Sequence, residues 1–114
     1  MIKRLITKIS NLKLKPFNRY GKPIPKLSWY PISYDKKSSH GSYILKFKPG
    51  GKSLKHKHLG IEEFLVLEGS LKDSDNTEFK VGDFVTFKPG SIHFSSSVKG
   101  CLLLVFMRGI NKLL

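Results

Sequence analysis

Residues 54–73 read LKHKHLGIEEFLVLEGSLKD, and this stretch decides the fold class. In its first part, His56 and His58 alternate with lysines, and in its second part, Glu62 begins an alternating run of apolar residues. Alternation with a period of two is typical of β-strands, because successive side chains of a strand point to opposite faces. The pattern predicts two strands that are joined by a turn at Gly60 and carry both histidines and Glu62 on their inner faces.

The chain from residue 41 onward has the same texture. Short runs of β-branched, aromatic and leucine residues are separated by turn signals, which are PGG at 49–51, EGS at 68–70, DSDN at 73–76, VGD at 81–83, KPGS at 88–91 and VKG at 98–100. Such spacing indicates an all-β sandwich or barrel. No helical pattern is long enough to cover a parallel sheet, so an α/β fold is not expected.

Alternation also brings His93 to the inner side, since it shares a face with Ser95 in SIHFSSS. A buried carboxylate without a partner costs several kcal/mol, so an inward Glu62 among inward histidines requires a compensating positive charge. A divalent metal ion supplies that charge. Histidines two residues apart on a strand have Cα atoms about 6.5–7 Å apart, which lets both imidazoles reach one ion.

The order and spacing of these residues resemble the two sequence motifs of the cupin family. The first motif corresponds to H-x-H-x3-E-x6-G at residues 56–69, and the second to G-x6-P-G-x2-H at residues 82–93. Within the cupins, HKHLGIEEFLVLEGSLKD, VGDFVTFKPGSIH and KGCLLLV are most similar to the small cupin domain of ChrR-type anti-sigma factors and to its stand-alone relatives. The resemblance covers about residues 29–108. It implies an all-β cupin-type jelly-roll barrel with a metal bound by His56, His58, Glu62 and His93.

The implied ligand set limits the metal without choosing it. Three imidazoles and one carboxylate suit Zn, Fe, Mn, Ni or Cu as a divalent ion. The strand faces also predict an inner wall near the metal, and the predicted substrate pocket consists of Tyr43, Phe47, Phe64, Ser95 and Met107. Barrel packing is the alternative role for each of these side chains. Tyr30 and Tyr34 are candidates to close the mouth of the barrel.

The charge is uneven along the chain, although its formal sum is +13. Residues 1–60 contain fifteen Lys and Arg against Asp35 alone, whereas residues 61–114 contain six against seven acidic residues. A basic half is typical of nucleic-acid binding, but eighteen of the 21 basic residues are Lys and no nucleic-acid-binding motif accompanies them. We therefore expect a solvated lysine-rich surface and no nucleic-acid partner. Anchoring of the N-terminal part to RNA, DNA or anionic lipid is the alternative.

Composition divides the chain into two parts. Residues 1–28 are basic and contain three of the six prolines, so we expect an extended arm there, followed by the cupin barrel over residues 29–114. The single cysteine, Cys101, excludes an internal disulfide and is predicted to be a core thiol, with a reactive thiol as the alternative.

Location and assembly are also predicted. No stretch approaches the roughly 20 apolar residues of a membrane span, and Lys8 interrupts the apolar run of the N-terminus, so we expect a cytoplasmic protein without a membrane span. Small cupins commonly dimerise, so the resemblance implies a homodimer.

Two functions fit these features. The first is a metal-dependent enzyme of the dioxygenase, lyase or isomerase class that acts on a small oxygen-rich or anionic substrate. The alternative is a non-catalytic metal-dependent sensor or ligand-binding module, as the ChrR-type resemblance implies. The zinc-binding helical region that carries the anti-sigma activity of that family has no counterpart in residues 1–40, which contain no cysteine and only His40.

Overall fold

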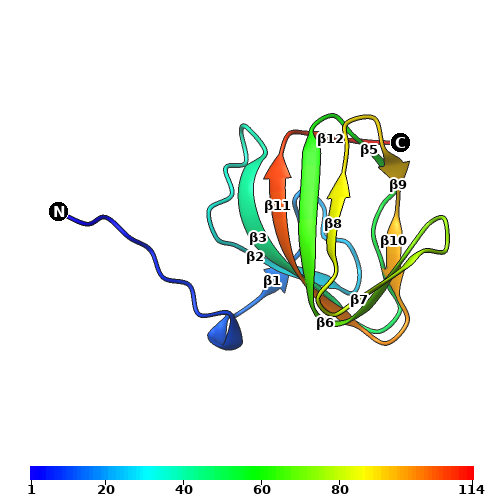
Figure 1. Cartoon of the computed structure of the whole chain (residues 1–114), viewed down its shortest axis with the longest axis horizontal. Helices are drawn as coiled ribbons and strands as arrows, with labels where there is room; N and C mark the ends of the chain where they lie inside the picture. The colour runs from blue at the N-terminus through cyan, green and yellow to red at the C-terminus, as the bar shows by residue number, and fades with distance from the viewer.

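Two antiparallel β-sheets enclose the core of the protein, and the computed structural model describes all residues from 1 to 114 (Figure 1). In the larger sheet the strand order is β1-β2-β3-β11-β6-β10-β4, with β7 and β8 also paired to β6, and in the smaller sheet it is β12-β5-β9. The strands are β1 (Lys15–Pro16), β2 (Leu27–Pro31), β3 (His40–Phe47), β4 (Gly51–Lys52), β5 (His56–His58), β6 (Ile61–Asp73), β7 (Glu78–Lys80), β8 (Phe84–Phe87), β9 (Ile92–His93), β10 (Ser95–Ser97), β11 (Cys101–Arg108) and β12 (Asn111–Leu113). The predicted all-β fold is confirmed.

Helical structure is limited to one 3-10 turn, Ile9–Asn11. The structure thus contains no helix with the length and apolar character that crossing a membrane requires.

The inner faces of β3 and β11 form one wall of the core. Tyr43 and Phe47 of β3 are buried and Lys46 is exposed, as the alternation predicts. β3 pairs with β11 over its whole length. The buried apolar cluster consists of Phe17, Ile24, Leu27, Trp29, Tyr43, Leu45, Phe47, Phe64, Val66, Leu71, Cys101, Leu103, Val105 and Met107. Burial raises the pKa of the Cys101 thiol to about 12, so this cysteine is a core residue without thiolate character at neutral pH.

The longest strand, β6, contains a bulge where the sequence predicts a turn. The turn expected at residues 68–70 is wrong, because these residues continue β6. The pairing of β6 with β11 shifts register just before them, between Val66 and Glu68. Gly69 has a φ of +72°, and a Cβ at this position would lie 2.1 Å from the carbonyl oxygen of Gly100, so the bulge requires glycine. The extra residue reverses the alternation, so that Val66 is buried before the bulge and Asp73 is buried after it.

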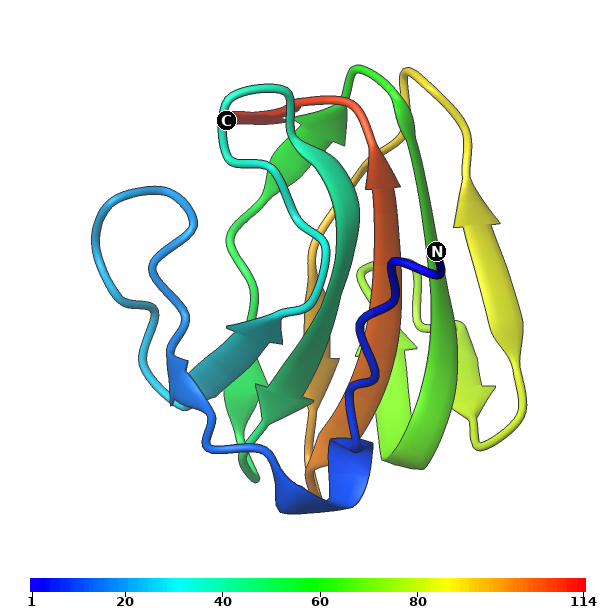
Figure 2. The ribbon, with the colours of Figure 1, turned by 90° about the vertical axis from the view of Figure 1, so that its left-hand side faces the viewer.

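The N-terminal segment consists of a projecting part and a packed part. Residues 1–8 extend away from the barrel in Figure 1, and the same dark blue chain runs in front of the barrel in Figure 2. Phe17 and Leu27 are buried, and the Phe17 ring packs edge-on against Trp29 with their centroids 5.0 Å apart. The part of the basic segment from residue 15 to residue 28 therefore covers one side of the barrel.

Candidate metal centre

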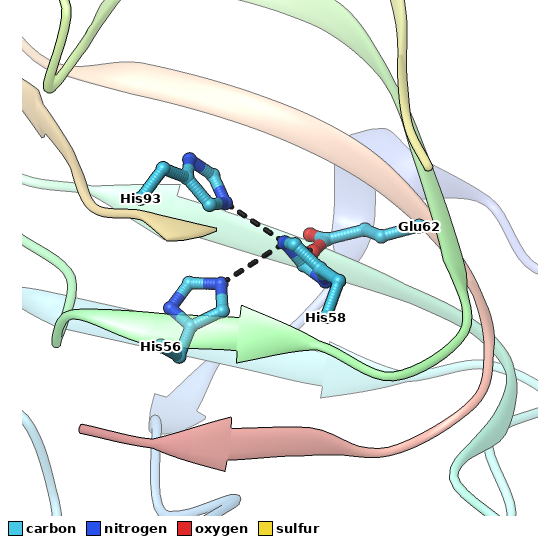
Figure 3. Close-up of side chains that lie close together, drawn as sticks. All are labelled: His56, His58, Glu62 and His93. Carbon is cyan, nitrogen blue, oxygen red and sulfur yellow. Dashed lines mark hydrogen bonds and ion pairs between the residues drawn. The ribbon is translucent and has the colours of Figure 1, made fainter. Parts of the chain in front are cut away.

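Short strand pairings bring the predicted ligands together (Figure 3). β5 carries His56 and His58, and both are buried. β9 pairs with β5 so that His93 lies opposite His56. Glu62 comes from the start of β6, and Figure 3 shows its carboxylate beside the His58 ring.

The turn at Gly60 returns the chain from β5 to β6. A Cβ at Gly60 would lie 2.4 Å from the carbonyl oxygen of Arg108 and 2.7 Å from the Cα atom of Gly109, so a larger residue does not fit there. This close approach allows Glu62 to fold back onto His58, with 2.9 Å between its Oε2 atom and the Nε2 atom of the ring. Close packing therefore requires glycine at position 60, between His58 and Glu62.

All four predicted ligands converge on one point. The Nε2 atom of His58 lies 3.1 Å from that of His56 and 2.8 Å from that of His93. The ligand atoms of the four residues all lie within 4.8 Å of one another. Nitrogen atoms that bind one ion at about 2.0–2.1 Å are roughly 2.9–3.4 Å apart at octahedral to tetrahedral angles. The observed spacing fits ligands of a single ion.

Hydrogen bonds of the outer nitrogen in the His56 and His93 rings determine which nitrogen faces the point where the four side chains converge. The Nδ1 atom of His56 donates to the carbonyl oxygen of Leu54 at 2.6 Å, and that of His93 donates to the carboxylate of Asp73 at 2.7 Å. With Nδ1 protonated, the Nε2 atom of each ring presents a lone pair towards the Nε2 atom of His58, which contacts the carboxylate of Glu62. Lone pairs and a carboxylate that face one another repel unless a cation lies between them, so the donor set fits a divalent metal ion.

The protonation states of the ligands also suit a metal. Burial lowers the pKa of His56, although its hydrogen bond to Leu54 and the charge of Glu62 raise it. Burial raises the pKa of Glu62, but the hydrogen bond with His58 and the positive potential of the histidines outweigh it and hold that pKa below its usual value. Neutral imidazole and ionised carboxylate are the forms that bind metal ions.

Asp73 completes the site behind His93, and the strand alternation does not predict it. Its Oδ1 atom accepts hydrogen bonds from Nδ1 of His93 at 2.7 Å and from Oγ of Ser95 at 3.4 Å. A carboxylate behind a ligating histidine fixes the orientation and the tautomer of the ring. Counting in steps of two from Glu62 places Asp73 on the outer face, because that count ignores the bulge. The available signal was Gly69, since a glycine inside a strand pattern often marks a bulge.

A cavity of about 40 Å³ lies beside the ligands and is lined by His56, Glu62 and His93 but not by His58. Of the predicted pocket residues, Tyr43, Phe47, Phe64 and Ser95 also line it, whereas Met107 is buried in the core without reaching it.

The second wall of this cavity comes from the packed N-terminal segment. Its residues there are Phe17, Arg19, Tyr20 and Ile24, none of which the sequence pattern predicts. The Nε atom of Arg19 donates to the hydroxyl of Tyr34 at 2.9 Å. Irregular, proline-containing backbone has no periodicity from which the inner face can be deduced.

Two other candidate side chains lie apart from the centre. His40 is exposed, and its Nδ1 atom donates to the carbonyl oxygen of Ser38 at 2.8 Å. Tyr30 on β2 is half-buried and does not line the cavity.

Comparison with known proteins shows what the whole chain resembles. The family model described as ChrR Cupin-like domain matches residues 4–111. The fold resembles that of an acetylacetone dioxygenase from Acinetobacter johnsonii, with a TM-score of 0.80 and 14% identity over 100% of this chain and 80% of that chain. It also resembles the polyketide cyclase RemF from Streptomyces resistomycificus, with a TM-score of 0.71 and 19% identity over 100% of this chain and 86% of that chain.

A third similar structure is the Rhodobacter sphaeroides complex of SigE with the anti-sigma factor ChrR. The TM-score is 0.65 at 17% identity, and the match covers 86% of this chain and 49% of that chain. No curated protein matches the sequence. At these identities, the likeness to solved structures shows the fold alone.

Proposed function

Because the chain belongs to the ChrR cupin-like family, we propose that it is a metal-dependent cupin enzyme of the dioxygenase, lyase or isomerase class. Its substrate is a small oxygen-rich or anionic molecule that enters the cavity beside His56, Glu62 and His93. The observation that carries this proposal is the convergence of three imidazoles and one carboxylate, within 4.8 Å, at the wall of a cavity.

The residues of the site have separate tasks in this proposal. The four ligands would hold a divalent ion, which supplies Lewis acidity and, when the ion is iron or copper, a means of activating dioxygen. His58 does not line the cavity, so the substrate meets the centre from the side of the other three ligands. Asp73 holds the ring of His93, while Phe47 and Phe64 keep the cavity wall apolar.

Tyr43 is a hydrogen-bond donor to the substrate in this proposal. Burial raises the pKa of its phenol well above the usual value, although the charge of Arg19 lowers it. The hydroxyl therefore stays protonated at neutral pH and can donate to an oxygen of the substrate.

The similar structures support the enzyme class. The same fold carries an acetylacetone dioxygenase and a polyketide cyclase in other chains. Because fold alone does not determine the reaction, the substrate has to be found by experiment.

The test is turnover by protein reconstituted without oxygen, with Fe(II) in one sample and Zn(II) in another. We expect at least one of a small 1,3-diketone, a thiol acid and a sugar acid to be converted, with oxygen uptake if the reaction is a dioxygenation. His58→Ala is expected to lower the rate by more than about 100-fold, and His40→Ala is the matched control. Protein that retains its metal, consumes no oxygen and changes none of these compounds contradicts the proposal.

The second candidate function is metal-dependent sensing without catalysis. The family match and the similarity to the ChrR complex favour it. A protein partner that is released by His58→Ala and by chelation of the metal, together with no turnover by the wild type, would support sensing over catalysis. A partner that binds equally well with and without metal would contradict it.

Assembly and location are proposed separately. We propose a cytoplasmic homodimer, and light scattering of the purified protein measures its mass. A monomer mass at micromolar concentration would contradict the dimer.

A further inference from the structure

Arg19 is a buried cation without an anionic partner. The residue is 9% exposed, and its guanidinium lies against the rings of Tyr20, Tyr34 and Tyr43, at 5.3, 5.5 and 6.0 Å from their centroids. Its Nε atom donates to the hydroxyl oxygen of Tyr34 at 2.9 Å, and its Nη1 atom to that of Tyr43 at 3.4 Å. None of the ion pairs of the protein includes Arg19. Neutral phenols and rings therefore surround the positive charge.

This arrangement leaves binding capacity unused. The Nη2 group of Arg19 makes no hydrogen bond within the protein, and the bond of Nη1 is long. A buried guanidinium is costly unless an anion compensates its charge. Its planar fork of N–H donors matches the two oxygens of a carboxylate. The unused donors are therefore complementary to a carboxylate from outside the chain.

Arg19 faces the same cavity as three of the four proposed metal ligands, His56, Glu62 and His93. Glu62 is the only carboxylate in its lining, and that carboxylate already contacts His58 at 2.9 Å. A divalent ion held by three neutral imidazoles and one carboxylate leaves a centre with a net charge of about +1. With the metal bound, two positive centres border one small cavity, which favours an anionic ligand between them.

We propose that Arg19 and the hydroxyl of Tyr43 bind the carboxylate of a small organic acid, a second oxygen of which reaches the metal. The proposal rests on the proposed function, because it names the substrate class of the same site. The oxygen of Tyr43 accepts from Arg19, which leaves its O–H free to donate to the carboxylate.

Asn111 indicates a further group on the ligand. Its Nδ2 atom donates to the hydroxyl of Tyr20 at 3.1 Å, whereas its Oδ1 atom is buried without a hydrogen-bond partner. Asn111 lines the same cavity, so its free acceptor complements a hydroxyl donor on the ligand. Glycolate, which carries one carboxylate and one hydroxyl, is therefore the probe.

The test is a titration of the zinc-loaded protein with glycolate and, in parallel, with uncharged glycolamide. Trp29 is the single tryptophan, and its ring lies 5.7 Å from Tyr34 and 5.3 Å from Tyr43, so its fluorescence reports on occupancy. We expect glycolate to bind and glycolamide to bind much more weakly. Arg19→Gln is expected to weaken glycolate binding by about 10- to 100-fold. Arg4→Gln removes an equal charge from the exposed N-terminus and is expected to leave the Kd unchanged.

Further variants separate binding from a structural role. Arg19→Lys keeps the charge but loses the planar fork, so it is expected to weaken binding less than Arg19→Gln. If thermal melts show that Arg19→Gln is unfolded, Arg19→Lys and Tyr43→Phe take its place, and both are expected to bind glycolate more weakly than Arg4→Gln.

Three results would overturn the proposal. They are no binding of glycolate by the folded wild type, equal binding of glycolate and glycolamide, and an unchanged Kd in Arg19 variants that only lose stability. The last result would mean that Arg19 only stabilises the fold, through its contacts with the tyrosines. Zinc content measured in the same samples tests the metal centre separately. Titration of the metal-free protein with glycolate tests the contribution of Arg19 alone.

Discussion

The two walls of the cavity are built in different ways. The barrel wall carries the proposed metal ligands on β5, β6 and β9, where strand pairing determines the position of each side chain. The N-terminal wall carries Phe17, Arg19 and Tyr20 on an irregular segment between β1 and β2. The first wall presents lone pairs and a carboxylate, and the second presents a guanidinium. The proposed metal donors and the positive charge of Arg19 therefore reach one cavity from two different segments, one made of paired strands and the other irregular.

Phe17→Ala is expected to have the largest effect on stability, because it removes the anchor of the N-terminal wall. The Phe17 ring is 4% exposed and packs against Trp29 and Tyr43, at centroid distances of 5.0 and 6.1 Å. We expect the free energy of unfolding in urea to fall by about 3–5 kcal/mol. Ile6→Ala, at a side chain that is 69% exposed, is the control and is expected to change it by less than about 0.5 kcal/mol. Equal, small effects of both substitutions would mean that this wall is not packed.

Asp73→Ala is expected to have an intermediate effect, on the barrel wall. It removes the acceptor of the 2.7 Å hydrogen bond from His93, so we expect zinc affinity to fall by about 10- to 100-fold in competition with a chromogenic chelator. Asp73→Asn keeps an acceptor oxygen and is expected to lose less affinity. Asp75→Ala changes an exposed carboxylate in the next turn and serves as the control. Equal zinc affinity of the Asp73 and Asp75 variants would exclude a positioning role for Asp73.

The barrel wall could be predicted from the sequence because strands alternate strictly. That rule predicts inner faces for His56, His58, Glu62 and His93, and the resemblance to the cupin motifs implies that they share one site. The structure brings their ligand atoms within 4.8 Å of one another. The rule fails for Asp73, because one extra residue at the bulge reverses the alternation. A strict count in steps of two does not allow for that residue.

The N-terminal wall and the extent of the pocket could not be predicted in this way. Arg19 lies on backbone without a repeating pattern, so its basic side chain was grouped with the solvated lysines. Met107 shows a second limit, since it is on the inner face of β11 as expected and pairs with Glu62, but does not line the cavity. Alternation determines the face of a residue and not which of the buried side chains border a cavity.

Removal of residues 2–8 is expected to have the smallest effect. These residues project from the barrel, and all except Thr7 are exposed. We expect the free energy of unfolding to change by less than about 0.5 kcal/mol, with no change in zinc affinity. A loss comparable to that of Phe17→Ala would contradict the division of the N-terminal segment into a projecting part and a packed part.

The central claim is that the three histidines and Glu62 form a metal centre. Elemental analysis of protein purified without oxygen tests it most directly, with His58→Ala and His40→Ala prepared in the same way. We expect about one divalent ion per chain in the wild type and in His40→Ala, and almost none in His58→Ala. Equal metal content in wild type and His58→Ala, or a folded wild type that binds no divalent ion even after reconstitution, would contradict it.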